Sequence, residues 1–271
     1  MANKNIGLIG VGNMGGAILG GIIKTELFEK DSIYLYDSDF KKTKAFENQG
    51  IMTMRDEICL VDTCDIILLC VKPQMFTELC GKISSAVTPD KIIVTIAAGI
   101  SIEYLKSKLG SDRKIIRVMP NTPLMLESGA SAISCDDITS EDEKKIIFEI
   151  FKALGAVEFI DEGKMNEIIA VNGSSPAFFY EIADIMASYA ESKGIDYQMA
   201  LNLVCATMIG SAKMMLESGK SPSSLVEMVC SPGGTTISAM NKLREGKIDK
   251  ILLDTMESCT QRAYELQKNI I

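Results

Sequence analysis

Short apolar runs alternate with amphipathic stretches from Asn5 to about Ile160. The runs have the length of strands, and the early ones are almost wholly apolar, as strands buried on both faces of a sheet are. This alternation predicts an α/β fold with a parallel sheet and crossover helices. The predicted strands are Asn5–Ile9, Ser32–Tyr36, Ile66–Val71, Ile92–Ile96, Lys114–Val118, Ala130–Ser134 and Ala156–Ile160.

The helix before the last predicted strand is marked at both ends. Ser140 and Glu143 form a capping-box pattern, and Gly155 follows as a stop signal. The apolar face of this helix consists of Ile146, Ile147, Ile150 and Phe151.

The pattern changes near Asp161–Lys164, after which long helical periodicities replace the strand-length runs. We therefore predict an α/β domain over residues 1–161 and an all-helical domain over residues 162–271. The helical part has apolar faces rich in Met, Ala and Leu. They could form an internal core, but helix pairs bury such faces incompletely, which favours burial shared between two chains.

Charge and composition exclude several functions. The 28 Lys and Arg against 36 Asp and Glu give a net charge of −8, which opposes binding to nucleic acid. The chain has no histidine, so Ser-His triads and His-containing zinc or haem sites cannot form. We expect no metal site, and any proton transfer must use another group.

The eight cysteines form no C-x-x-C pair and lie mostly in apolar stretches, which favours a reducing cytoplasm. The uncharged segment Ile6–Ile23 could mimic a signal peptide or a membrane span. Seven of its eighteen residues are glycine, however, and Asn13 lies in its middle. This composition favours a strand, a turn and a helix start, so we expect no membrane association.

The segment Gly10-Val11-Gly12-Asn13-Met14-Gly15 directly follows the first predicted strand and opens a helix. This is the context of a dinucleotide-binding fingerprint, with glycines for a tight turn, for close approach of a pyrophosphate and for helix packing. An ordinary glycine-rich turn is the alternative. The candidate cofactor residues of this turn are Gly10, Gly12, Asn13, Met14 and Gly15.

The second predicted strand ends at Tyr36, and Asp37 and Ser38 follow it. An acidic side chain there would accept hydrogen bonds from an adenosine ribose, which favours NAD. Asp37 could instead only cap the next helix, and Lys41 or Lys42 could neutralise a 2′-phosphate. Both NADH and NADPH therefore remain candidate cofactors.

Three more loops follow predicted strands at the same edge of the sheet, where open α/β folds bind ligands. Each could also be an ordinary turn. Their candidate cofactor residues are Val71, Lys72 and Pro73, then Ala97, Ala98 and Gly99, then Met119 and Asn121.

In the helical part, the segment Ser231-Pro232-Gly233-Gly234-Thr235-Thr236 precedes a predicted helix over Ile237–Arg244. Two glycines and two hydroxyls at a helix N-terminus form a nest of free N–H groups that suits a carboxylate. A helix cap rich in turn residues is the alternative.

Together with Gly173-Ser174-Ser175-Pro176-Ala177, these segments resemble, in order and over essentially the whole chain, the pyrroline-5-carboxylate reductase family. The resemblance implies a Rossmann-like dinucleotide-binding domain followed by an all-helical dimerisation domain. It also implies hydride transfer from NADPH or NADH to 1-pyrroline-5-carboxylate, which yields L-proline as the last step of proline biosynthesis. The implied assembly is a homodimer or a larger assembly of dimers, such as a decamer.

The resemblance also assigns roles to individual residues. It places the Thr236 hydroxyl beside the ring nitrogen as the catalytic group, and the backbone from Gly233 to Thr236 around the carboxylate. Asn172 replaces the small residue usual in the family, and Arg55-Asp56-Glu57 replaces an asparagine near the adenosine. The implied substrate-binding residues are Glu162, Asn172, Ser231, Gly233, Gly234, Thr235 and Thr236.

Two other functions remain open. A hydroxyacid dehydrogenase has a similar layout but needs a catalytic lysine soon after the Gly173 segment, and this chain has none there before Lys193. A dinucleotide-binding sensor or scaffold would bind the cofactor without turnover.

Overall fold

The computed structural model describes residues 4–270 of the chain. Contacts divide the chain into two compact units, one of Met1–Ser174 with Cys259–Ile271 and one of Ser175–Ser258. This division differs from the boundary predicted between residues 161 and 162. Residues 162–174 and the end of the last helix make their contacts within the first unit.

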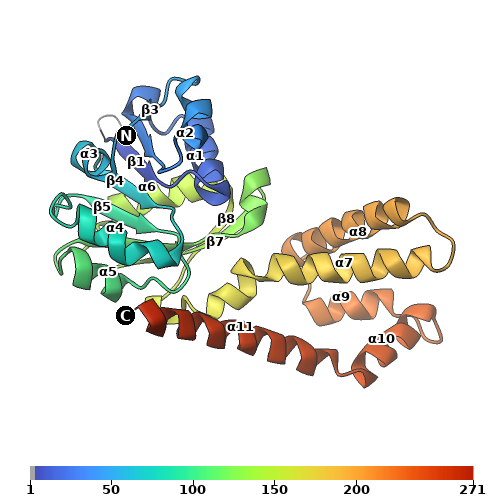
Figure 1. The fold of residues 1–271 in the computed structure, drawn as a ribbon. Coiled ribbons are helices and arrows are strands. Elements are labelled where there is room, and N and C mark those ends of the chain that lie inside the picture. The colour runs from blue at the N-terminus through green and yellow to red at the C-terminus, as the bar shows by residue number, and fades with distance from the viewer. Residues whose placement is uncertain (1–3, 271) are drawn as a thin grey trace. The chain divides into compact units, whose positions relative to one another are not determined.

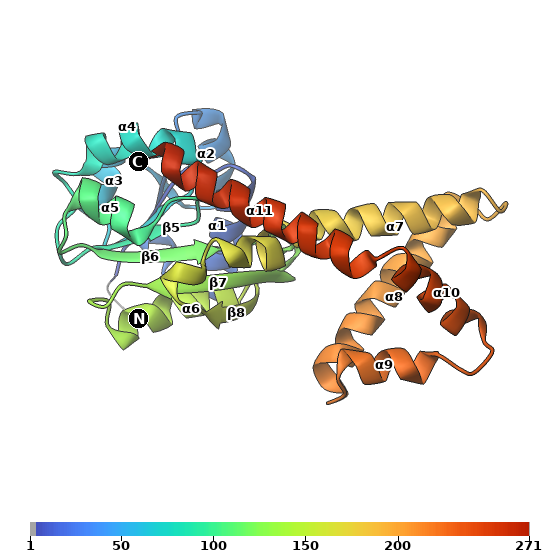
Figure 2. The ribbon, with the colours of Figure 1, turned by 90° about the horizontal axis from the view of Figure 1, so that it is seen from below.

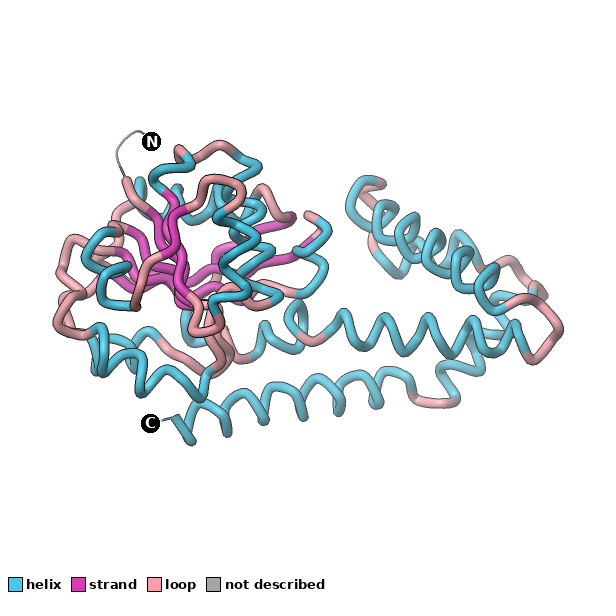
Figure 3. Tube along the Cα trace, turned by 45° about the horizontal axis from the view of Figure 1, so that its top comes forward, coloured by secondary structure: helices cyan, strands magenta, loops and turns pink. Residues whose placement is uncertain are grey.

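Within the described residues, eight strands form one sheet in the order β3-β2-β1-β4-β5-β6-β7-β8. Figure 3 shows the strands as a central layer with helices on both sides. The strands are β1 Ile6–Ile9, β2 Ile33–Tyr36, β3 Met52–Thr53, β4 Ile66–Leu69, β5 Ile92–Thr95, β6 Lys114–Met119, β7 Gly129–Cys135 and β8 Gly155–Phe159.

The prediction of a parallel sheet is wrong for one pair of strands, because β7 runs antiparallel to β6. The connection between them holds only a short 3₁₀ turn, Thr122–Leu126. A parallel connection needs a crossover of a dozen or more residues, so this short link forces the chain to reverse. The two-residue strand β3 was not predicted.

Six helices cover the two faces of the sheet (Figure 1). Ile6 and Leu8 of β1 are fully buried in the core that contains side chains of α1 and α6, whereas Ile9 lies in the core formed with α3, α4 and α5. This alternation anchors the carboxyl end of β1 from both sides. The helices are α1 Asn13–Thr25, α2 Phe40–Glu47, α3 Glu57–Thr63, α4 Phe76–Ile83, α5 Ile102–Leu109 and α6 Glu141–Lys152.

The predicted capping box of α6 is confirmed. The Ser140 hydroxyl accepts from the Glu143 N–H, and the Glu143 carboxylate accepts from the Ser140 N–H at 3.0 Å. The four apolar residues predicted for its buried face are all buried.

After Phe159 the described part of the chain contains helices and no strand, as predicted. Helix α11 begins in the second unit and ends in the first, and it runs without a break from Ile248 to Ile270 (Figure 2). The helices of the second unit are α7 Ser175–Glu191, α8 Tyr197–Glu217, α9 Pro222–Val229, α10 Thr235–Glu245 and the first part of α11.

The helices α7 and α8 expose large apolar side chains, among them Tyr189 (66%), Leu203 (64%) and Ile209 (61%). Of the helices in the described residues, α8 alone is long and apolar enough to cross a membrane, and only 6% of its apolar window is buried within the chain. Length and composition are weak grounds for a membrane span. Large apolar side chains exposed in such number on two helices indicate an interaction face.

Candidate active site

The glycine turn after β1 has the geometry that its sequence predicts. Gly10 has a φ of +97°, and a Cβ there would lie 2.8 Å from the Cys70 carbonyl oxygen. A Cβ on Gly15 would overlap the Gly10 carbonyl oxygen. Glycine is therefore required at both positions, first for the turn and then for the contact of α1 with β1.

Gly12 differs from these two glycines, because a Cβ there would have nothing within 4 Å. Gly12 precedes the first residue of α1, Asn13, and has no side chain with which to cap that helix. The first turn of α1 also has no acidic residue. An open approach to helix N–H groups at a positive helix end fits a pyrophosphate.

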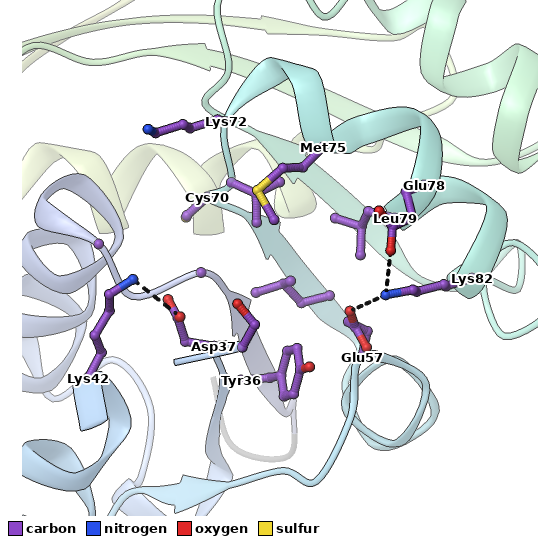
Figure 4. Close-up of a pocket in the computed structure, with 15 residues that line it drawn as sticks. Tyr36, Asp37, Lys42, Glu57, Cys70, Lys72, Met75, Glu78, Leu79 and Lys82 are labelled. Carbon is purple, nitrogen blue, oxygen red and sulfur yellow. Dashed lines mark hydrogen bonds and ion pairs between the residues drawn. The ribbon is translucent and has the colours of Figure 1, made fainter. Parts of the chain in front are cut away.

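A cavity of about 330 Å³ adjoins this turn. Figure 4 shows the side chains that line it, which come from the carboxyl ends of β1, β2 and β4 and from α2, α3 and α4. The structure thus brings together residues from three separate predicted loops. The predicted cofactor residues that line the cavity are Gly10, Gly12, Asp37, Ser38, Val71 and Lys72.

Asp37 is 7% exposed and both of its carboxylate oxygens are engaged. Oδ2 accepts from the Val11 N–H at 2.8 Å, and Oδ1 accepts from the Asp39 N–H at 2.9 Å. Lys42 Nζ lies 3.4 Å from Oδ1 (Figure 4). The cap of α2 is Asp39 rather than Asp37. Asp37 therefore ties the glycine turn to β2 while it also faces the cavity.

The far wall of the cavity was missed by the sequence analysis. Lys82 Nζ lies 3.3 Å from Glu57 Oε1 and 3.0 Å from Glu78 Oε1 (Figure 4). Hydrogen bonds to Glu78 and then Glu57 raise the pKa of Lys82. Burial raises the pKa of Tyr36, which lines the same cavity. The available signal was the i, i+4 spacing of Glu78 and Lys82 on the helix after the Val71–Pro73 loop.

The remaining predicted cofactor loops follow strands that run parallel to β1. Pro73 begins a short 3₁₀ turn after β4, and Ala97, Ala98 and Gly99 follow β5. Met119 is the last residue of β6. Because β1, β4, β5 and β6 are parallel, all these loops emerge at one edge of the sheet.

Asn121 and Asn172 hold the loop after β6 in place. Asn172 Nδ2 donates to the carbonyl oxygens of Met119 at 2.7 Å and Ala130 at 3.0 Å. Asn121 Nδ2 donates to the Asn172 carbonyl oxygen at 3.1 Å, and its Oδ1 accepts from the Ala130 N–H at 2.8 Å. The Asn121 side chain is thus bonded to backbone through both its amide atoms, and the Asn172 side chain through its nitrogen.

Glu162 belongs to a 3₁₀ turn, Glu162–Lys164, at the end of the sheet region. Its Oε1 accepts from Arg117 Nη1 at 3.1 Å and from the Ile102 N–H at 3.1 Å. Arg117 lies within β6, is 1% exposed and was not predicted. A single charge within the otherwise apolar run Ile115–Met119 was the signal for it.

The predicted substrate loop lies wholly in the second unit. Gly233 has a φ of +70°, and the Gly234 N–H donates to the Ser231 carbonyl oxygen at 3.0 Å. Gly234 then precedes the first residue of α10, Thr235, and cannot cap it with a side chain. The first turn of α10 has no acidic residue. This arrangement suits a carboxylate for the same reason as the turn before α1 suits a phosphate.

Thr236 lines a cavity of about 1020 Å³ within the second unit. Its other lining residues include Cys230 and several methionines, of which Met214, Met215, Met228 and Met240 are examples. The Thr236 hydroxyl is therefore a polar group in largely apolar surroundings.

Comparisons with known proteins cover nearly the whole chain. Residues 162–266 match the family described as "Pyrroline-5-carboxylate reductase dimerisation", and residues 5–99 match "NADP oxidoreductase coenzyme F420-dependent". The chain is 36% identical to pyrroline-5-carboxylate reductase of Escherichia coli, over 98% of this chain and 99% of that protein. It is 33% identical to the Methanosarcina acetivorans enzyme, over 99% and 100% of the two chains.

Among solved structures, the fold is similar to Plasmodium falciparum pyrroline carboxylate reductase with NADP bound. The TM-score is 0.90, with 26% identity over 98% of this chain and 99% of that one.

Proposed function

This chain belongs to the pyrroline-5-carboxylate reductase family, and from that membership we propose that it reduces 1-pyrroline-5-carboxylate to L-proline with NADPH or NADH. The observation that carries the proposal is the uncapped start of α10 behind Gly233 and Gly234, a carboxylate-binding geometry in the segment most specific to the family. A hydroxyacid dehydrogenase would need a lysine that the chain lacks at the required place.

The residues around Gly12 fit a dinucleotide, because the turn leaves open space where a Cβ would stand and presents helix N–H groups to it. When bound, the reduced nicotinamide supplies the hydride. In this proposal the glycine turn holds the pyrophosphate, and Asp37 and Ser38 hold the adenosine ribose. The loops Val71–Pro73 and Ala97–Gly99, with Met119 and Asn121, shape the remainder of the cofactor site.

On the substrate side, the backbone N–H groups from Gly233 to Thr236 bind the carboxylate in this proposal, and the Thr236 hydroxyl orients the ring nitrogen. Ser231, Thr235, Glu162 and Asn172 complete the substrate-binding set. A protonated imine accepts hydride far better than a neutral one, and the chain has no histidine to supply the proton. We assign the proton to solvent or to the bound substrate, and most of the rate to orientation in a partly dry site.

We further propose that residues 1–161 act as the dinucleotide-binding domain and residues 162–271 as the dimerisation and substrate domain. The dimerisation family matched over residues 162–266 supports this division. The exposed apolar faces of α7 and α8 are the surfaces that a second copy would cover, and dimers could assemble further into decamers. Eight free cysteines in the described part of the chain support a reducing cytoplasm, and the net charge of −8 argues against nucleic acid as a partner.

The test is steady-state kinetics with 1-pyrroline-5-carboxylate and each reduced nucleotide, followed by nucleotide absorbance. Thr236→Ala should lower turnover by roughly tenfold or more, the loss typical of one positioning or acid–base contact. Thr255→Ala is the matched control, since among the described residues its hydroxyl donates to the Ile251 carbonyl oxygen, one turn earlier in α11, and to no other group. Unchanged turnover in Thr236→Ala would remove Thr236 from the mechanism. Oxidation driven only by 3-hydroxy acids, or nucleotide binding without turnover, would contradict the proposed function.

A further inference from the structure

Arg117 is a charged side chain placed where strands normally carry apolar ones. It is the fourth residue of β6 and pairs in register with Thr95 of β5. It is 1% exposed, and its Nε has no partner among the described residues. A guanidinium is tolerated at such depth only if its other nitrogens are well paired.

Those other nitrogens join two segments beyond the strand. Nη1 donates to Glu162 Oε1 at 3.1 Å, and Nη2 donates to Asn166 Oδ1 at 3.1 Å. Arg117 thus ties the Glu162 carboxylate and the Asn166 amide together from within the sheet, because the planar guanidinium holds its two terminal nitrogens in a fixed relative orientation.

The same Glu162 oxygen accepts from the N–H of Ile102, the first residue of α5, at 3.1 Å. Glu162 therefore caps α5 from 60 positions away in the chain. Ser101 precedes that helix, and its hydroxyl accepts from the Tyr104 N–H at 3.0 Å. These two caps hold the end of the loop Ala97–Ser101 at the start of α5. The cap by Glu162 depends on Arg117, which bonds to the same carboxylate oxygen.

The other partner of Arg117 leads to the opposite side of this loop. Asn166 Nδ2 donates to Gln267 Oε1 of α11 at 2.6 Å. A Cβ on Gly99 would lie 3.2 Å from the Gln267 backbone nitrogen, so the end of α11 packs directly against the loop. The network centred on Arg117 therefore reaches the Ala97–Ser101 loop at two places. Glu162 bonds to Ile102 directly after the loop, and the end of α11 packs against Gly99 within it.

The position of this loop in the sheet shows what it controls. Asp37 follows β2 on one side of β1, whereas the loop follows β5 on the other side, beyond β4. A dinucleotide with its pyrophosphate at β1 and its adenosine at β2 extends its nicotinamide half toward β4 and β5. We propose that Arg117 is a positioning residue, which acts through Glu162 and Asn166 to fix the Ala97–Ser101 loop for the nicotinamide half of the cofactor.

This inference rests on the proposed function for the identity of the cofactor, but its main test does not require turnover. The affinity of each variant for NADPH is compared with its affinity for ADP, which carries the adenosine and the pyrophosphate but neither the nicotinamide riboside nor the 2′-phosphate. In Arg117→Met we expect NADPH binding to weaken by about tenfold while ADP binding stays within about twofold, because only the nicotinamide half meets the loop. Turnover should fall by between tenfold and a hundredfold, as a shift of about 1 Å in a reacting group does.

Arg117→Lys should recover part of both losses, since an ammonium can pair with Glu162 but cannot reproduce the fork to Asn166. Lys114→Met is the matched control, because Lys114 begins the same strand and its ion pair with Glu143, at 2.6 Å, lies at the amino end of β6. That variant should lower the melting temperature without changing the ratio of NADPH to ADP affinity.

Arg117→Met also leaves a carboxylate without its partner, which destabilises the fold. The double variant Arg117→Met/Glu162→Leu replaces the pair by apolar side chains, which restores stability and still removes the cap on Ile102. It should show the same selective loss of NADPH affinity. The proposal would be overturned if this double variant kept the wild-type ratio of NADPH affinity to ADP affinity. It would also be overturned if Arg117→Met lowered the melting temperature and changed neither affinity. Wild-type protein that fails to reduce 1-pyrroline-5-carboxylate would contradict the proposed function and leave the affinity test valid.

Discussion

Gly12 offers a direct test of the cofactor turn, because replacing it should separate binding from folding. A Cβ at Gly12 meets nothing within 4 Å, and the backbone there has a φ of −69°, which alanine adopts without strain. Alanine is a poorer N-cap than glycine by about 0.5–1 kcal/mol. Alanine also lowers the entropy of the unfolded chain, which stabilises by a similar ~0.4–1 kcal/mol. The two effects nearly cancel, so we expect Gly12→Ala to fold with wild-type stability.

Binding should respond differently. The added methyl group projects into the space through which a pyrophosphate would approach the N–H groups of α1. A hydrogen bond to a charged group contributes about 1.5–3 kcal/mol, so losing one such bond weakens binding by roughly tenfold to a hundredfold. The measurement is NADPH affinity by calorimetry, together with the free energy of unfolding in urea.

Gly20→Ala is the matched control, since Gly20 lies on the exposed side of the same helix, also with nothing within 4 Å. It should stabilise the protein by about 0.5–1 kcal/mol, as alanine does within a helix, and leave NADPH affinity unchanged. If Gly12→Ala binds NADPH as tightly as the wild type, this turn does not hold the pyrophosphate.

Three other experiments test separate parts of the structure. Burial raises the pKa of Cys70 to about 12, so iodoacetamide at mildly alkaline pH should label it in denatured but not in native protein, as peptide mass spectrometry would show. Because the folded-state pKa is the higher one, the stability from this buried thiol is complete below the unfolded pKa of about 8.5 and is lost as the pH rises further. Leu203→Glu/Ile209→Glu should turn a dimer into a monomer in light scattering, and an unchanged mass would place the interface elsewhere. Asp37→Asn removes a negative charge beside the cofactor cavity and should raise the ratio of NADPH to NADH initial rates several-fold, whereas a constant ratio would exclude Asp37 from cofactor selection.

Much of the fold could be predicted because its signals are local. The strand predicted at Ile66–Val71 and the capping box of Ser140 each depend on a few adjacent residues. The strand is found at Ile66–Leu69 and the capping box is present as predicted. The direction of β7 has no such signal, since alternation along a strand is the same in both directions. Strand β3, Met52–Thr53, is too short to show alternation at all.

The residues of the candidate site could likewise be predicted where their signals are local. The turn Gly10–Gly15 is visible in the sequence because one segment provides the whole geometry. Lys82 has a partner within its own helix, Glu78, but its pairing with Glu57 spans 25 positions, and that of Arg117 with Glu162 spans 45. Both groupings were missed because these distant partners could not be known from the sequence. Sequence patterns identify the type of such a residue, but the partner that neutralises its charge becomes known only when the strands are assembled.

Helix α11 carries the chain from the helical unit back to the sheet unit, so that residues 259–270 belong to the same unit as the strands β1 to β8. During synthesis the sheet unit therefore stays incomplete while residues 175–258 are made, and the Ala97–Ser101 loop lacks its neighbour Gln267 until that part of α11 has been synthesised. Maturation of nucleotide binding should thus follow synthesis of the whole helical unit, so that a defect in folding of residues 175–258 would also delay formation of the cofactor site.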